Sequence, residues 1–261
     1  MQITKDIAAI VTGGASGLGR ASAIALADAG CRVAVFDINE EQGETVAREV
    51  GGVFCNVNIM DEESVVAGFE KARAANGQER ILVHCAMATK GGKTLSRNRQ
   101  TGEITRLSTE DYAFGAEGIL IASYRIASHA ALGMAKAEPL NEDGERGCIV
   151  LTASVAAQDA QVGQVVYGSA KAGVNGLVLP MARDMMDLGI RVNSIMPGTM
   201  ATPPMMAAPE KVLQGLAASV PFPKRLGKPE EFASLVLELA RNGYFNGQNI
   251  RLDGAIRMPP R

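Results

Sequence analysis

Three polar side chains in the second half of the chain have the types and spacing of an acid–base centre. Ser154 ends the apolar run I-V-L-T-A-S, and Tyr167 and Lys171 lie four residues apart in V-V-Y-G-S-A-K-A-G-V. Residues four apart share one face of a helix, so we expect the Lys171 ammonium to depress the pKa of the Tyr167 phenol. Tyr167 would then take the proton of an alcohol as hydride leaves, while Ser154 holds the substrate oxygen. Ser154, Tyr167 and Lys171 are therefore the predicted catalytic residues.

A glycine pattern near the N-terminus gives this trio a context, because a Tyr-x-x-x-Lys pair alone is more often a chance surface pair. The segment T-G-G-A-S-G-L-G, residues 12–19, follows a β-branched run and leads into the alanine-rich stretch 20–29. Strand, glycines and helix in this order suit pyrophosphate binding at a helix N-terminus, whereas a simple tight turn is the structural alternative. The predicted cofactor contacts here are Gly13, Ser16, Gly17, Leu18 and Gly19.

An acidic residue marks the end of the second expected strand. Asp37 comes 18 residues after Gly19, where a carboxylate can accept both ribose hydroxyls of NAD and repel the extra phosphate of NADP. Neither Arg32 nor Arg48 occupies the position beside it that would favour NADP. A helix-capping or turn aspartate is the alternative interpretation. The pattern favours NAD as the cofactor.

Length and composition narrow the class of protein. The 261 residues are 47% hydrophobic and carry a net charge of −2, which fits one α/β domain and gives no general attraction for nucleic acid or anionic membranes. The four cysteines have no metal-site or disulfide spacing. The N-terminal residues lack the basic and apolar regions of a signal peptide, and no stretch approaches the length of a membrane span. We expect a cytoplasmic protein that binds a small molecule and no metal.

Short β-branched runs alternate with longer amphipathic stretches along the whole chain. This alternation predicts a single Rossmann-type doubly wound α/β domain over residues 1–261, with a seven-stranded parallel sheet flanked by helices. We expect irregular structure in three segments, 90–107, 137–147 and 197–228. The expected strands are Ile7–Val11, Arg32–Asp37, Val53–Asn56, Ile81–Cys85, Cys148–Thr152, Arg191–Ile195 and Asn249–Leu252.

These motifs together make the chain resemble the classical short-chain dehydrogenase/reductase family from end to end. The matching segments are T-G-G-A-S-G-L-G, Asp37, S-V-A-A, Y-G-S-A-K, R-V-N-S-I-M-P-G-T-M-A-T-P and N-G-Q-N-I-R-L-D-G-A. Within the family, T-A-S-V-A-A-Q-D-A-Q-V-G-Q and the ending I-R-L-D-G-A-I-R-M are similar to the type II 3-hydroxyacyl-CoA dehydrogenase branch. The resemblance implies a homotetramer that uses NAD to oxidise a secondary alcohol on an acyl-CoA or a steroid-like molecule.

The same resemblance implies further cofactor contacts. Asn58 stands where the family often has an aspartate for the adenine amino group. Pro197 would flank the nicotinamide ring, and the backbone of Gly198 and the hydroxyl of Thr202 would meet its amide. The complete set carried over, beyond the glycine turn and Asp37, is Asn58, Ile59, Cys85, Ala86, Tyr167, Lys171, Pro197, Gly198 and Thr202.

Two residues depart from the family pattern. Met87 stands where the family usually has a glycine after the fourth strand, so its side chain must point away from the cofactor or displace it. Ile119 stands where an asparagine usually completes the proton relay, and isoleucine cannot hold a relay water. His84 has no clustered metal ligands, and we interpret it as a structural strand residue.

Three functions remain open on the sequence alone. The first is an NAD-dependent 3-hydroxyacyl-CoA dehydrogenase, and the second is a dehydrogenase of a steroidal or alicyclic alcohol. The basic segment 90–106 would distinguish them, because it can attract coenzyme A phosphates, although a solvated loop is its simpler interpretation. The third is a nucleotide-binding protein with little or no catalytic activity, which Met87 and Ile119 suggest.

Overall fold

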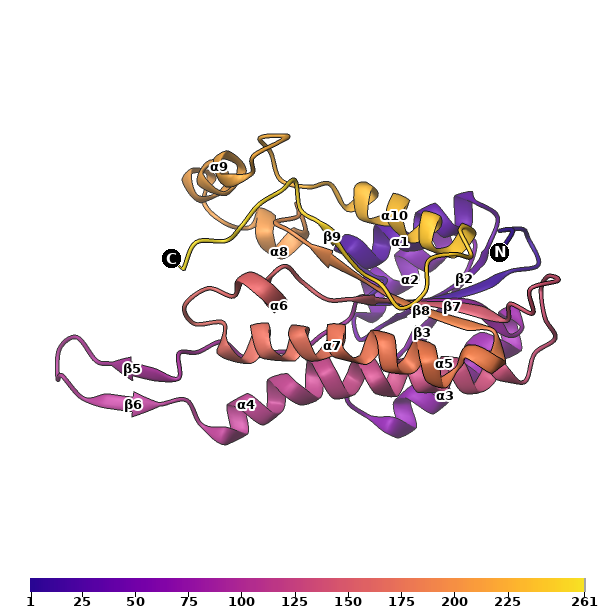
Figure 1. Ribbon diagram of the computed structural model, residues 1–261, viewed down its shortest axis with the longest axis horizontal. Helices are drawn as coiled ribbons and strands as arrows, with labels where there is room; N and C mark the ends of the chain where they lie inside the picture. Colours follow the sequence, from indigo (N-terminus) through magenta and orange to yellow (C-terminus); the bar gives the residue numbers. More distant parts are fainter. Residues whose placement is uncertain (261) are drawn as a thin grey trace.

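The computed structural model describes residues 1–260 and is built around one large parallel sheet (Figure 1). The strand order is β3-β2-β1-β4-β7-β8-β9, and every neighbouring pair runs parallel. This confirms the predicted doubly wound α/β fold with seven strands. The strands are β1 (Ala8–Thr12), β2 (Arg32–Asp37), β3 (Val53–Asn56), β4 (Glu79–His84), β7 (Gly147–Thr152), β8 (Ile190–Pro197) and β9 (Asn249–Leu252).

Helices cover both faces of the sheet because its strands alternate buried side chains to each side. In β1, Val11 packs in the cluster that includes Leu26 and Phe232, whereas Ile10 packs in the opposite cluster with Ile126. One layer holds α1 (Gly17–Asp28), α2 (Glu40–Glu49) and α10 (Pro229–Arg241). The other layer holds α3 (Glu62–Asn76), α4 (Thr109–Ala116), the π-helical turn η1 (Glu117–Ile121), α5 (Ala122–Ala135) and α7 (Val165–Asp184).

The order of the strands reverses at β1, which lies between β2 and β4. Thr12 at the end of β1 pairs with Phe36 on one side and His84 on the other. In open α/β sheets a crevice forms at such a reversal, beyond the carboxyl ends of the strands. The glycine turn follows β1 directly, and Ser154 lies two residues beyond the end of β7. The fold therefore brings both predicted motifs to the same edge.

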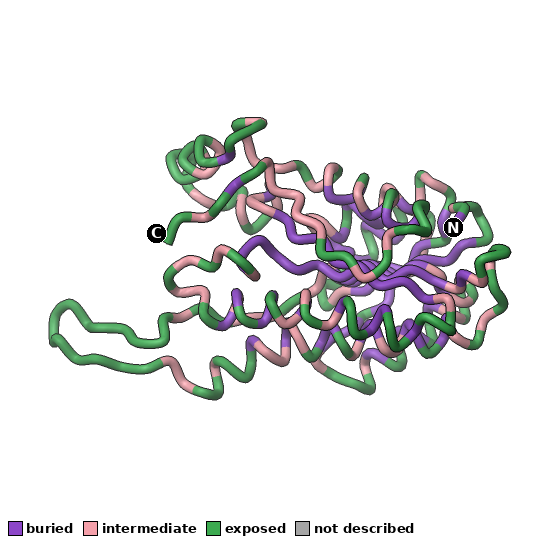
Figure 2. Tube along the Cα trace, viewed as in Figure 1, coloured by how far each residue is buried: buried purple, intermediate pink, exposed green. Residues whose placement is uncertain are grey.

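The prediction of irregular structure over residues 90–107 is partly wrong, because this segment contains a β-hairpin. Strands β5 (Leu95–Arg97) and β6 (Ile104–Arg106) pair antiparallel and form a separate two-stranded sheet. The turn that joins the two strands is stabilised by Asn98, whose side-chain oxygen accepts the N–H of Gln100 at 2.8 Å. Every residue of both strands is exposed, and the hairpin projects from the body of the molecule (Figure 2). The usual cue of one buried face is missing here, so the sequence pattern did not reveal the strands.

The segment 197–228 was also expected to be irregular and contains two helices. They are α8 (Pro203–Met206) and α9 (Glu210–Ser219), which lie near the short helix α6 (Ala156–Asp159) and the C-terminal tail (Figure 1). Irregular structure over residues 137–146 is confirmed, whereas Gly147 already belongs to β7. Within residues 1–260, every helix is too short or too polar to cross a membrane.

Candidate active site

The glycine turn has a backbone conformation that requires glycine at two of its positions. Gly13 has φ of +65°, and a Cβ at this position would approach the backbone nitrogen of Ala86 to 2.8 Å. A Cβ on Gly19 would lie 2.1 Å from the carbonyl oxygen of Gly13. The first turn of α1 has no acidic residue, and no side chain caps it. Its first N–H groups are therefore free to bind an anion such as a pyrophosphate.

Asp37 faces this turn from the end of β2. One carboxylate oxygen accepts the N–H of Ala15 at 3.1 Å, and the other accepts the N–H of Asn39 at 3.0 Å. A carboxylate has about four acceptor sites, so both oxygens retain capacity for further donors. The side chain thus serves both interpretations made from the sequence, since it fixes a turn and still presents acceptors for ribose hydroxyls.

A single cleft at the carboxyl ends of the strands, with a volume of about 590 Å³, collects the predicted site residues. It extends from the glycine turn, past the ends of β2 and β4, to α7 and the loop after β8. Their roles as catalytic or cofactor residues stay predictions. The predicted residues that line it are Gly13, Ser16, Gly17, Leu18, Gly19, Asp37, Asn58, Ile59, Cys85, Ala86, Ser154, Tyr167, Lys171, Pro197, Gly198 and Thr202.

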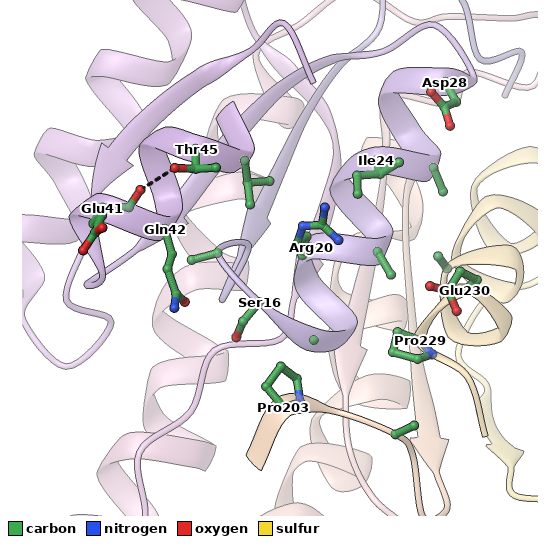
Figure 3. A pocket seen from close by; sticks show the side chains of 17 residues that line it. Ser16, Arg20, Ile24, Asp28, Glu41, Gln42, Thr45, Pro203, Pro229 and Glu230 are labelled. Atoms are coloured by element: carbon green, nitrogen blue, oxygen red, sulfur yellow. Dashed lines mark hydrogen bonds between the residues drawn. The ribbon is translucent and has the colours of Figure 1, made fainter. Parts of the chain in front are cut away.

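A second groove, of about 650 Å³, lies on the other side of the glycine turn between α1, α2 and α10 (Figure 3). Three carboxylates, Asp28, Glu41 and Glu230, line it. Its one basic residue is Arg20, which is already paired with Glu49 at 2.7 Å. Such a surface repels phosphate groups. The strand-end cleft is therefore the better site for a dinucleotide.

The catalytic trio meets where α7 passes the end of β7. Lys171 is 4% exposed, and its ammonium donates to the carbonyl oxygen of Thr152 at 2.6 Å. The same nitrogen lies 5.8 Å from the centroid of the Tyr167 ring. The Ser154 hydroxyl accepts the N–H of Ala156 at 3.1 Å, which orients it at the start of the segment after β7. The helical spacing predicted for Tyr167 and Lys171 thus places them on one face, toward Ser154.

Burial dominates the electrostatics of the trio. It lowers the pKa of Lys171 to about 8, because the ammonium loses solvation in the interior. Burial also raises the pKa of Tyr167, and the neighbouring Ser154 hydroxyl offsets part of this rise. The expected depression of the phenol pKa by Lys171 is therefore not realised in the protein alone. A further positive charge in the cleft would favour the phenolate.

The two departures from the family pattern lie on either side of the trio. Met87 is 46% exposed and lines the cleft, so it borders the space in which the cofactor would lie. Ile119 is 1% exposed and belongs to η1, within the apolar cluster that includes Ala170. His84 is likewise buried, at 2% exposure, and its ring Nδ1 lies 2.7 Å from the Thr12 hydroxyl. The strand position predicted for His84 is thus confirmed.

Several cleft residues lacked a recognisable sequence signal. Gln164 and Met258 line the cleft from the segment before α7 and from the C-terminal tail. Met200 and Met205, from the methionine-rich segment 181–206, also line it. Thioether side chains are flexible and suit an adaptable apolar wall. Within residues 1–260, no group of three or more His, Cys, Asp or Glu side chains forms a metal site.

Comparison with known proteins adds independent information. The family model described as enoyl-(acyl carrier protein) reductase matches residues 13–256. The 3-hydroxyacyl-CoA dehydrogenase type-2 of Drosophila melanogaster is 43% identical over 258 residues, which covers 98% of this chain and 99% of that protein. The Homo sapiens protein of the same name is 40% identical and is covered to 97%. A crystal structure of 3-hydroxyacyl-CoA dehydrogenase type-2 from Mycobacterium avium superposes with a TM-score of 0.89 at 40% identity, with both chains covered completely.

Proposed function

The chain belongs to the short-chain dehydrogenase/reductase family, and on that premise we propose that it interconverts 3-hydroxyacyl-CoA and 3-ketoacyl-CoA thioesters with NAD as cofactor. The chain is an oxidoreductase that acts on CH–OH groups. The observation that carries the proposal is the convergence of Ser154, Tyr167 and Lys171 with the glycine turn in one cleft. The names of relatives at 40–43% identity support the thioester substrate.

The residues of the cleft fit a dinucleotide. The free N–H groups at the start of α1 suit the pyrophosphate, and the spare acceptors of Asp37 suit the ribose of NAD. The close approach of Gly13 to Ala86 leaves the backbone bare where the cofactor would lie. When bound, NAD supplies the hydride acceptor and a positive charge near the phenol. That charge is the one that Tyr167 needs, because burial alone raises its pKa.

The protein side chains then handle the proton and the oxygen. Ser154 donates its hydroxyl hydrogen to the substrate oxygen and fixes its position. Tyr167 Oη accepts the alcohol proton in oxidation and returns it in reduction. Lys171, held by the Thr152 carbonyl, keeps its ammonium 5.8 Å from the centroid of the Tyr167 ring, where it would add to the positive charge of bound NAD in favouring the phenolate.

The steroid or alicyclic alcohol alternative uses the same trio, so the surroundings must decide. A hollow of about 480 Å³ at the base of the hairpin is lined by Lys93 and Arg99. Lys93 also lines a neighbouring hollow that shares Gln164 with the active-site cleft. A coenzyme A thioester with its carbonyl at Tyr167 can therefore extend its phosphates toward two cations. A neutral steroid gains nothing from them.

A substrate panel tests the proposal directly. We expect acetoacetyl-CoA to oxidise NADH, followed by absorbance, with a kcat/KM at least about a hundredfold above that of steroid ketones. A preference for steroid ketones would select the alternative. Activity with neither class would contradict both dehydrogenase assignments.

The basic hollow yields a substitution that separates binding from chemistry. We expect Arg99→Ala to raise KM for acetoacetyl-CoA about fivefold, the equivalent of about 1 kcal/mol for a solvent-exposed ion contact. The kcat should not change, since Arg99 lines a separate hollow and not the cleft that holds the trio. A short N-acetylcysteamine thioester, which lacks the phosphates, should keep its KM.

Arg97→Ala is the matched control, because it removes the same charge from the same hairpin without lining the hollow. Equal effects of the two substitutions on KM would show that only the general charge of the hairpin matters. No effect of Arg99→Ala would remove this support for the thioester.

We also propose that the protein is a homotetramer, as its family resemblance implies. The outer face of the α4–α5 layer exposes large apolar side chains, among them Ile121, Tyr124 at 54% and Leu132 at 56%. Contiguous exposed apolar surface of this kind marks an interface between proteins. We expect light scattering to give the mass of four chains, and Tyr124→Glu to lower it. Val66→Glu, on α3, is the control that should leave the mass unchanged, and a monomeric wild type would contradict the proposal.

We propose a cytoplasmic location, without nucleic acid or membrane as partners. All four cysteines are free, and burial raises the pKa of Cys31 to about 12 and that of Cys55 to about 11. Protonated, unpaired thiols suit a reducing compartment. The net charge of −2 supports the expected lack of attraction to nucleic acid. Fractionation of cells that express a C-terminally tagged chain tests the location, and recovery with membranes would contradict it.

A further inference from the structure

His84 is a buried, titratable side chain that the mechanism above does not use. It ends β4, between Thr12 of β1 and Leu151 of β7. Strand side chains alternate, so His84 points to the same side as Leu82, toward the cluster that contains Ile119. Lys171 reaches the same end of the sheet from α7, because its ammonium donates to the carbonyl oxygen of Thr152 at 2.6 Å, and Thr152 directly follows Leu151, the strand partner of His84. His84 therefore lies beneath the catalytic lysine.

The contacts of Thr12 determine which ring nitrogen of His84 carries the hydrogen. The Thr12 hydroxyl oxygen accepts the backbone N–H groups of Cys85, at 3.2 Å, and Ala86, at 3.3 Å. The Cys85 N–H is shared with the Thr12 carbonyl oxygen, at 3.1 Å, but both N–H groups still point at the lone pairs of the hydroxyl, which leaves its own hydrogen for His84 Nδ1, 2.7 Å away. A neutral imidazole with Nδ1 as acceptor carries its hydrogen on Nε2. Burial lowers the pKa of His84 to about 3, so the ring stays neutral in the working range of pH.

The Nε2–H group has no acceptor among residues 1–260, although it is fully buried. Leaving such a donor unpaired costs about 1–3 kcal/mol. Lys171 also has unused donors, because an ammonium has three N–H groups and its one hydrogen bond within residues 1–260 goes to the carbonyl oxygen of Thr152. Both donors lie at the carboxyl end of the sheet, on the side that α7 covers, and each lacks an acceptor. A water oxygen can accept from both, as buried waters usually do.

We propose that His84 is a positioning residue for proton transfer, and that its Nε2–H holds an internal water against the ammonium of Lys171. The inference rests on the proposed dehydrogenase function. In oxidation, Tyr167 Oη takes one proton from the alcohol. Lys171 Nζ gives one proton to the water, which passes a proton on to solvent, and Nζ is then replenished by the proton that leaves Tyr167 Oη. Both side chains return to their starting protonation states. Ile119 is apolar and cannot hold this water, so the anchor lies on the strand beneath the lysine instead.

Two amide substitutions separate the two nitrogens of the ring. In His84→Asn, the short side chain keeps an acceptor for the Thr12 hydroxyl but has no donor at the Nε2 position. In His84→Gln, the longer amide places a donor there. We expect His84→Asn to lower kcat about tenfold, and His84→Gln to retain at least about half of it, within the range of a general acid–base contribution. The KM for NAD should stay the same in both.

A purely structural role of His84 predicts the opposite order, because Asn preserves the Thr12 contact and Gln does not. A kcat of His84→Asn equal to or above that of His84→Gln would therefore overturn the proposal. The solvent deuterium isotope effect on kcat should be larger in His84→Asn than in the wild type, since proton release then limits turnover. An unchanged isotope effect and an unchanged pH profile of kcat would also count against the relay.

Ile119→Asn tests the same idea from the facing turn. With His84 already in place, this substitution should leave kcat within about twofold of the wild type. In the His84→Asn background, it should recover most of the lost kcat, because the new amide offers the water a second anchor. A large gain from Ile119→Asn alone would show that His84 supplies no relay.

Measurements on the resting protein keep this inference separate from the proposed function. The chain has two histidines, so the ¹⁵N spectrum of labelled protein, compared with that of His129→Gln, assigns His84. We expect Nε2 to be protonated and Nδ1 to be bare, and a crystal structure to show a water bonded to both Nε2 and Lys171 Nζ. The Nδ1-protonated form, or a dry site, would refute the inference even in an active enzyme. An inactive wild type with this water present would refute only the dehydrogenase function.

Discussion

The Tyr167→Phe variant is expected to lose at least about a thousandfold in kcat while it still binds NAD. Within the trio, the phenol is the group that takes the alcohol proton, since the Ser154 hydroxyl donates to the substrate oxygen and the Lys171 ammonium, bonded to the Thr152 carbonyl, has no lone pair to accept a proton. Phenylalanine keeps the ring, so the packing around this partly buried position is preserved. The measurements are NADH absorbance with acetoacetyl-CoA and cofactor binding by fluorescence or calorimetry.

Tyr112→Phe is the matched control, because its hydroxyl contacts Ser169 at 3.0 Å outside the cleft. It should keep the wild-type kcat. Turnover that survives in Tyr167→Phe would contradict the assigned role. Absence of turnover in the wild type, with NAD bound, would instead favour the nucleotide-binding protein of little activity that Met87 and Ile119 suggested.

The fold was predictable because its signals are local. Three strands, β2, β3 and β9, begin and end where the sequence pattern placed them, β7 begins one residue early, and β1 is displaced by one residue. Strands β5 and β6 were not predicted, since their apolar residues Leu95 and Ile104 remain exposed. A hairpin without a buried face carries no periodicity that distinguishes it from a loop.

The site was predictable in its members more than in its energetics. Motif spacing was enough to place Gly13, Asp37 and Tyr167 in one cleft, because each follows a strand or begins a helix at the same edge. The pKa of Tyr167 was not predictable, since it depends on how deeply α7 packs against the sheet. The unpaired Nε2–H of His84 depends on the hydrogen bonds of Thr12 and has no sequence signature at all.

Replacement of Asp37 is expected to have the second large effect, on the choice of cofactor. In the wild type, we expect a kcat/KM for NAD at least about a hundredfold above that for NADP, because the carboxylate bonds the ribose hydroxyls and repels a phosphate. The adjacent Ile38 is 71% exposed and lines the same cleft, so no cation beside Asp37 compensates that repulsion.

Asp37→Asn removes the charge, while its single amide oxygen can still accept the N–H of Ala15 that holds the turn; the exposed N–H of Asn39 then bonds water instead. We expect this variant to melt near the wild-type temperature and to lose about tenfold or more of the preference for NAD, about 1.4 kcal/mol for each factor of ten. Adding Ile38→Arg supplies a cation for the phosphate and should reverse the preference. Steady-state kinetics with both cofactors measure the ratio. If Asp37→Asn keeps the full preference, repulsion by the carboxylate is not its cause, and the choice of cofactor must come from the shape of the cleft around Ser16 and Ile38.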